Sequence, residues 1–222
     1  MSLPAPLLAL GLVVALGLPV RNVYRRRELR SKLDWPWLRR SLLRNWAVVS
    51  GFALLVGVAG APEDLGLRVQ SVGVLVDGLL FGFIAFAGTM LLVGLLLRFG
   101  GGVTASASSL VVFEQSLSSR LFVAATAAVT ESVLFYGFAM EAVYGLGGGP
   151  WLAGGVAATG TLLSRSWRGT DLVLQWLPGA VVLAGVAVWS RTLLVVMPIY
   201  FVYNGLVLAS GDADDYAVPE DG

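Results

Sequence analysis

The longest apolar stretch of the chain runs from Val69 to Leu97 and reads VQSVGVLVDGLLFGFIAFAGTMLLVGLLL. Its 29 residues contain one charged side chain, that of Asp77. A helix of about 20 predominantly apolar residues is long enough to cross the hydrocarbon core of a bilayer. The stretch therefore predicts a membrane-spanning helix, and with it a membrane protein.

The composition of the whole chain agrees with this prediction. Of its 222 residues, 57% are apolar and 13% are charged, and the mean hydropathy is +0.80. A soluble domain carries about 25% charged residues, so both a soluble globular protein and a disordered one are excluded. The chain has no cysteine and no histidine. Disulfides, thiolate or imidazole metal ligands, a cysteine nucleophile and a histidine base are therefore excluded as well.

Six more apolar runs are candidate spans. They are Leu3–Val20, Trp46–Ala61, Leu121–Gly145, Trp151–Leu163, Asp171–Trp189 and Leu193–Ser210. Together with residues 69–97 they predict an all-α, polytopic transmembrane helix bundle of about seven spans. Because Trp151–Leu163 has only 13 residues, fewer than a full span needs, six spans are the alternative.

The uneven distribution of basic residues predicts the orientation in the membrane. Nine of the 15 Lys and Arg residues lie between Arg21 and Arg44, in a predicted loop of residues 21–45. Cytoplasmic loops carry an excess of Lys and Arg, so this loop is placed in the cytoplasm and the N-terminus outside. Alternation of the spans then puts 13 of the 15 basic residues and the C-terminus inside, with Arg68 and Arg191 outside.

The charged segments also predict partners and domain limits. The basic residues Arg21–Arg44 are expected to attract anionic lipids of the bilayer, and no nucleic acid partner is expected. Residues 211–222 carry five acidic side chains and are expected to form a disordered, solvated tail. The chain is thus divided into N-terminal spans (1–119), a transmembrane core (120–210) and the tail.

Three ionisable residues fall inside predicted spans, where an unpaired charge is costly and indicates function. Asp77 and Glu141 lie toward the ends of their runs, so both are expected near a membrane interface. Glu131 lies near the middle of Leu121–Gly145, close to mid-depth. It is therefore the main candidate for a functional group.

A second polar set lies in the last span. Tyr200 and Asn204 are four residues apart and so share one face of a helix. An intramembrane Asn needs a hydrogen-bond partner, and Glu131 is the expected one. Tyr200 or Asn204, with Tyr136 or Ser132, is expected within hydrogen-bond reach of the same carboxyl group, directly or through water. Both an interhelical contact and a reaction site remain open on these residues alone.

Around Glu131 the sequence resembles a known family, the type II CAAX prenyl proteases and bacteriocin-processing (CPBP) intramembrane metalloproteases. The first motif of this family is E-E-x-x-x-R, usually with Phe before the Arg and Gly after it. The segment TESVLFYGF, residues 130–138, matches at three positions and differs at two. The matches are Glu131, Phe135 and Gly137; the differences are Ser132 for the second Glu and Tyr136 for the Arg.

The two other motifs of the family are degraded in a similar way. The motif F-x-x-x-H belongs to the next helix, and there Trp167 or Arg168 stands in the His position. The last motif is H-x-x-x-N or H-x-x-x-D; here Asn204 matches and Tyr200 replaces the His. The resemblance covers residues 120 to 208, the last four predicted spans.

The resemblance implies a protease-like helical core in which glutamates and histidines activate water beside a metal. The catalytic positions retained are Glu131 and Asn204, and the binding positions are Ser132, Tyr136, Trp167 and Tyr200. The missing His, Glu and Arg predict that no metal cofactor is bound and that peptidase chemistry is lost. Glu131 is then expected to be protonated, and Glu131→Gln to be nearly neutral for folding.

The expected function is that of a catalytically degenerate family member in the cell membrane. It would act as a membrane scaffold or as a binder of hydrophobic helices or lipids, with another membrane protein or a hydrophobic peptide as partner. Two alternatives remain open: an active intramembrane endopeptidase with Glu131 as base, and a small transporter or proton relay through Glu131 and Asp77.

Overall fold

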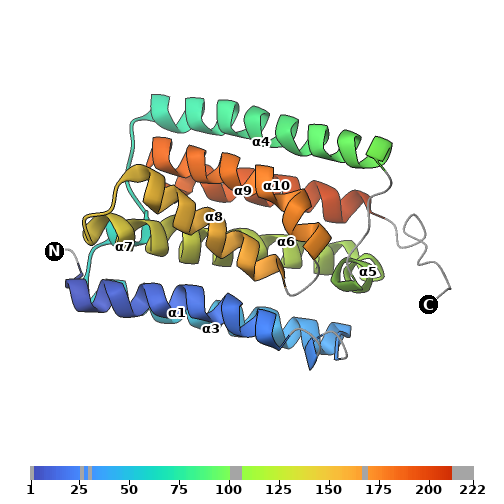
Figure 1. The fold of residues 1–222 in the computed structure, drawn as a ribbon, viewed down its shortest axis with the longest axis horizontal. Coiled ribbons are helices and arrows are strands. Elements are labelled where there is room, and N and C mark those ends of the chain that lie inside the picture. The colour runs from blue at the N-terminus through green and yellow to red at the C-terminus, as the bar shows by residue number, and fades with distance from the viewer. Residues whose placement is uncertain (1–2, 26–27, 30–31, 101–106, 167–169, 212–222) are drawn as a thin grey trace.

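Long, roughly parallel helices make up the computed structural model of the chain (Figure 1). The structure describes residues 3–25, 28–29, 32–100, 107–166 and 170–211. Within these ranges every regular element is helical and no strand is present. The prediction of an all-α fold is therefore confirmed.

The helices follow one another along the chain with short connections. The long ones are α1 (Ala5–Tyr24), α3 (Trp35–Ala59), α4 (Val72–Gly100), α6 (Leu117–Glu131), α8 (Pro150–Ser166), α9 (Thr170–Ser190) and α10 (Leu193–Ser210). The short ones are η1 (Pro62–Leu65), α5 (Ala107–Phe113), the π-helix η2 (Ser132–Ala139) and α7 (Met140–Gly145). Since α6, η2 and α7 follow each other without a break, residues 117–145 form one long rod.

Five helices in the described part of the chain are long and apolar enough to cross a membrane. They are Ala5–Tyr24, Trp35–Ala59, Val72–Leu96, Leu117–Gly145 and Leu193–Ser210. The chain thus has the helices of a multi-pass membrane protein. Helix α8, with 17 residues, and the apolar part of α9, Trp176–Ser190, are shorter. The count of seven spans stays a prediction.

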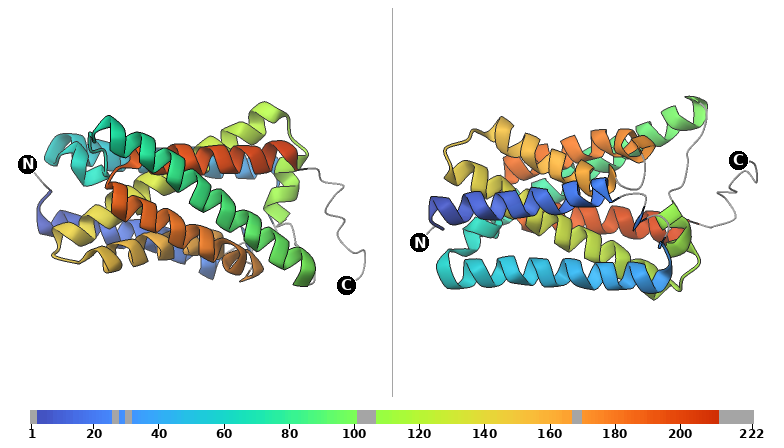
Figure 2. Two further views of the ribbon diagram at one scale, coloured as in Figure 1. Left: turned by 90° about the horizontal axis from the view of Figure 1, so that it is seen from above. Right: turned by 60° about the horizontal axis from the view of Figure 1, so that its bottom comes forward.

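The rods are stacked in layers that place α6 and α8 at the centre. In Figure 1, α4 lies at the top, α9 and α10 below it, then α6 and α8, with α1 and α3 at the bottom. The strongest packing joins α8 to α9 and α6 to α10. Figure 2 shows that the start of α1 and the end of α10 lie at opposite ends of the bundle.

The predicted basic loop, residues 21–45, is mostly helical. Helix α1 extends to Tyr24, and α3 already begins at Trp35, where the Asp34 carboxylate accepts a 2.7 Å hydrogen bond from the Trp37 N–H. The sequence predicts that the first helix ends at Val20, before the first arginine, and that the next one begins at Trp46, after the last. Arginine side chains can instead lie along a helix and extend their guanidinium groups toward water, so a charge does not end a helix.

The Glu28 carboxylate offsets part of the positive charge of this basic segment. Arg25 Nη2 and Lys32 Nζ lie 2.6 and 2.9 Å from Glu28 Oε1. The hydrogen bond from Arg25, and then that from Lys32, lowers the pKa of the Glu28 carboxyl to about 2. Glu28 is thus ionised at physiological pH. Arg26, Arg27 and Arg30 of the predicted lipid-binding cluster lie outside the described residues.

Arg120 ties three segments together at the end of the bundle where α10 finishes. Its Nη1 donates to the carbonyl oxygens of Leu208 and Gly211 at 3.2 and 2.7 Å, and its Nε donates to that of Gln115 at 2.9 Å. Its Nη2 donates to the carbonyl of Phe113. The carbonyls of Phe113, Leu208 and Gly211 belong to helix ends, where the backbone has no partner within the helix.

Replacing Arg120 with Gln is therefore expected to destabilise the fold by about 1–3 kcal/mol, the cost of leaving buried acceptors unpaired. The measurement is the free energy of unfolding in mixed detergent and SDS micelles. Arg39→Gln, which removes the same charge from an exposed position on α3, is the control and is expected to change the stability little. Equal effects of the two substitutions would contradict this role.

Candidate functional site

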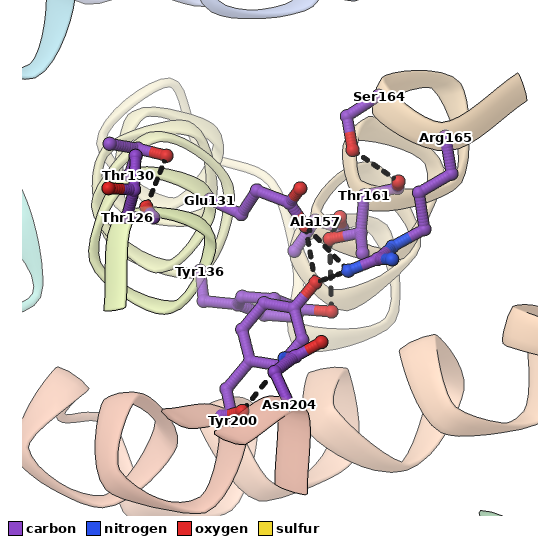
Figure 3. A network of polar contacts seen from close by, with 10 residues as sticks. All are labelled: Thr126, Thr130, Glu131, Tyr136, Ala157, Thr161, Ser164, Arg165, Tyr200 and Asn204. Atoms are coloured by element: carbon purple, nitrogen blue, oxygen red, sulfur yellow. Dashed lines mark hydrogen bonds and ion pairs between the residues drawn. The ribbon is translucent and has the colours of Figure 1, made fainter. Parts of the chain in front are cut away.

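Three central helices bring polar side chains together inside the bundle (Figure 3). Glu131 is the last residue of α6, Arg165 lies near the end of α8, and Tyr200 lies in the middle of α10. Arg165 Nη2 lies 3.3 Å from Glu131 Oε2. The Tyr200 hydroxyl accepts from Arg165 Nη2 and donates to the same carboxylate oxygen. The three groups form a closed triangle of hydrogen bonds.

This triangle is largely removed from solvent. The exposed fraction is 7% for the Arg165 side chain and 14% for that of Glu131, while Tyr200 is fully buried. The Arg165 guanidinium also stacks on the ring of Trp176, with Cζ 3.6 Å from the ring centroid. A buried charge is tolerated when it is paired and hydrogen-bonded, and both conditions are met here.

Arg165 is the site residue that the sequence analysis missed. It was assigned to a cytoplasmic loop because the apolar run was ended at Leu163. Helix α8 continues to Ser166, and the buried residues Ala157 and Thr161 are followed at the same spacing of four by Arg165. Continuing this inward-facing row for one more turn would have placed Arg165 in the core.

The π-helix η2 brings Tyr136 onto the side of the rod that carries Glu131. Hydrogen bonds in a π-helix join residues five apart, so such residues lie nearly above one another. Tyr136 is five residues after Glu131, and both point into the network of Figure 3. The Tyr136 hydroxyl lies 3.0 Å from Thr161 Oγ1 on α8, which in turn lies 3.1 Å from the carbonyl oxygen of Ala157.

The other predicted site residues have different outcomes. Asn204 is buried beside the triangle, but its Nδ2 donates to the backbone carbonyl of Tyr200 at 2.8 Å rather than to Glu131. Ser132 is buried, and its Oγ has no hydrogen-bond partner in the described part of the chain, so the expected contact with Glu131 is absent. Trp167 lies outside the described residues. Asp77 is exposed on α4.

Glu131 lies in the wall of two cavities on either side of α3. One has a volume of about 140 Å³ and reaches Arg165 and Trp176; the other, of about 120 Å³, extends toward α1. They share the lining residues Leu38, Leu42, Asn45, Thr130 and Glu131. A cavity of about 150 Å³ is large enough to hold benzene. Each cavity therefore has room for one large side chain or a short piece of acyl chain.

The donor set does not fit the divalent metal that the family resemblance implies. Among the described residues, no group of three or more His, Cys, Asp or Glu side chains could hold a metal ion. Glu131 is a single carboxylate, and the Arg165 guanidinium already occupies one side of it. A divalent ion needs several N or O ligands, and a fixed cation next to the only carboxylate repels it.

The expectation that Glu131 is protonated stays a prediction. It was based on a carboxyl group that has no cation in reach. In the structure Glu131 has a guanidinium beside it and accepts hydrogen bonds from Arg165 and Tyr200. Comparison with known proteins gives no further guide, because no family model, curated protein or solved structure matches the chain.

Proposed function

We propose that the chain is a degenerate member of the CPBP intramembrane protease family that binds hydrophobic helices or lipids and does not hydrolyse them. One observation carries this proposal. Two helices, α6 and α10, bring the family-like motif positions Glu131, Tyr200 and Asn204 to one place, and α8 supplies Arg165. Degraded motifs that are separate in the sequence thus converge in space.

The side chains present support loss of catalysis rather than a variant of it. Tyr200 stands in a His position and is a poor ligand for a divalent ion at neutral pH. Glu131, the only retained carboxylate, is bound by Arg165 and Tyr200. A general base must be able to contact water and accept its proton, and these two hydrogen bonds compete with that role. The ion pair takes the place that a metal and a base would share.

No observation favours the alternative of a proton relay through Glu131 and Asp77. Asp77 lies on the exposed face of α4, while Glu131 points into the centre of the bundle. Among the described side chains, neither cavity beside Glu131 has a lining residue from α4. The cavities are bordered by α3 and central helices instead, which favours binding of a hydrophobic group at that side.

Cross-linking at Asn45 tests the proposed binding directly, because the chain has no natural cysteine. A benzophenone maleimide on Asn45→Cys, between the two cavities, is expected to cross-link an added hydrophobic helical peptide saturably. Unlabelled peptide should compete. The matched control is Gly88→Cys, on the exposed face of α4 with no neighbouring atom within 4 Å.

The control is expected to give only weak adducts that increase linearly with peptide and are not competed. A saturable adduct with the bilayer lipid instead of the peptide, seen by mass spectrometry of Asn45→Cys alone, identifies a lipid as the ligand. Equal and unsaturable labelling at both positions would contradict the proposal of a binding site beside Glu131.

We also propose that the N-terminus lies outside and the C-terminus in the cytoplasm, since 12 of the 15 basic residues then lie inside, with Arg165 buried in the bundle. A fluorescent reporter fused after Gly222 is expected to be active, because such reporters fold in the cytoplasm. A reporter of the periplasmic type, active only after export, should be inactive at the same position. The reverse pair of results would overturn the orientation.

A further inference from the structure

A second charge cluster lies at the end of the bundle that holds η1 and the start of α10. Glu141 on α7 binds two arginines with one oxygen: Arg68 Nη2 lies 2.7 Å and Arg191 Nη2 lies 3.1 Å from its Oε2. Arg68 and Arg191 are the two basic residues that the predicted orientation places outside the membrane, away from the other thirteen. The cluster shares no residue with the Glu131 triangle, so it is argued independently of the proposed function.

The charges of this cluster do not balance. Two guanidinium groups face one carboxylate, so the ion-paired groups carry one positive charge in excess. The acids of η1, Glu63 and Asp64, form no ion pair with either arginine. The Glu141 side chain is only 5% exposed, whereas those of Arg68 and Arg191 are 35% and 30% exposed. The carboxylate thus lies beneath the two guanidinium groups, and part of each guanidinium side chain faces outward. A partly buried excess charge is stabilised by a counter-ion.

Hydrogen bonds from side chains fix the backbone at Arg68 and next to Arg191. Thr192 Oγ1 donates to the carbonyl oxygen of Arg68 at 2.9 Å, and Gln70 Nε2 donates to that of Ser190 at 3.1 Å. Arg191 has a left-handed backbone with φ of 52°, a conformation that non-glycine residues seldom adopt. Its guanidinium also stacks on Tyr144, with Cζ 3.8 Å from the ring centroid. The pair is therefore preorganised, which lowers the entropy lost when an anion binds.

The surroundings of the pair are typical of the membrane surface. Val69, next to Arg68, is 96% exposed, and Trp151 and Trp189 at the same end of the bundle are 93% and 58% exposed. Exposed tryptophans in membrane proteins gather at the level of the lipid headgroups. The anions available at this depth are the phosphate groups of phospholipids, and arginine forks bind phosphate well.

We propose that Arg68 and Arg191 together bind the phosphate of an anionic phospholipid. An anionic lipid such as phosphatidylglycerol balances the single excess charge of the cluster. A zwitterionic lipid such as phosphatidylcholine carries its own cation and compensates the charge less well. Single substitutions separate binding from folding, because removal of either arginine leaves Glu141 paired one to one with the other.

The experiment is a titration of the purified full-length protein in detergent with phosphatidylglycerol, followed by native mass spectrometry. The first bound lipid is expected to dissociate about tenfold more readily from Arg68→Gln and from Arg191→Gln than from the unchanged protein. Arg191→Lys keeps the charge but loses the planar fork, so an intermediate affinity is expected. Phosphatidylcholine should bind more weakly to the unchanged protein than phosphatidylglycerol.

Arg21→Gln is the control, since it removes the same charge from an exposed position near the opposite end of the bundle. Because Arg21 belongs to the basic segment that is expected to attract anionic lipids, this variant is expected to weaken the lipids that bind after the first and to leave the affinity of the first one unchanged. An equal loss in the control would show diffuse attraction and overturn the site. Unchanged affinity in both cluster variants would show that the arginines only hold the fold together. Displacement of the lipid by an equimolar amount of inorganic phosphate would overturn the assignment to a lipid.

Discussion

Replacing Arg165 with Gln is expected to lower the free energy of unfolding by about 3–5 kcal/mol, because Glu131 is then left buried without its cation. Glu131→Gln is expected to cost a similar amount, since it leaves the Arg165 guanidinium unpaired among Trp176 and Tyr200. This result differs from the neutral effect that the sequence alone predicted for Glu131→Gln. Unfolding in mixed detergent and SDS micelles measures both.

The double variant Glu131→Gln with Arg165→Gln tests whether the loss of stability in the single variants comes from the broken ion pair or from lost packing. Two neutral amides can still hydrogen-bond to each other and to Tyr200, and removal of both charges from a buried pair is often close to neutral. We therefore expect the double variant to be more stable than either single variant. A double variant that loses the sum of the two single effects would show that the residues do not interact.

Gly137→Ala is expected to cause the second large effect. An added Cβ at Gly137 on η2 would lie 2.3 Å from the carbonyl oxygen of Leu65 in η1, a backbone atom that cannot move alone. Overpacking of this kind costs about 1–3 kcal/mol. The matched substitution is Gly88→Ala on α4, where nothing lies within 4 Å of the new methyl group.

Gly88→Ala is expected to be neutral or to stabilise by up to about 1 kcal/mol, since alanine favours a helix more than glycine does. The same unfolding measurement compares the two variants. A Gly137→Ala protein as stable as Gly88→Ala would mean that η1 does not pack against η2 as closely as the structure has it.

The apolar runs predicted much of the fold, because long helices in a bilayer depend mainly on local composition. The all-helical class and the order of the long helices were predicted from the sequence. The start of α3 at Trp35 and the end of α8 at Ser166 were not, because charged residues were taken as helix ends. The π-helix also has no sequence signal, although Gly137 within it lies close to the carbonyl oxygen of Leu65.

The candidate site was predicted only in part. The contact between Glu131 and Tyr200 could be predicted, because both are polar residues at mid-span and such residues find each other. Arg165 and the two arginines on Glu141 could not be predicted in the same way. The choice of their partners depends on how α8 and the connection after η1 pack.

The most direct measurement of the central claim is a cleavage assay with the purified protein. Hydrophobic helical peptides and prenylated peptides would be incubated with it, with and without added Zn²⁺, and with the variant Glu131→Gln in parallel. The account predicts no turnover above the background of protein-free vesicles under any of these conditions, because Arg165 and Tyr200 hold the only retained carboxylate. Metal-dependent turnover that Glu131→Gln abolishes would contradict it.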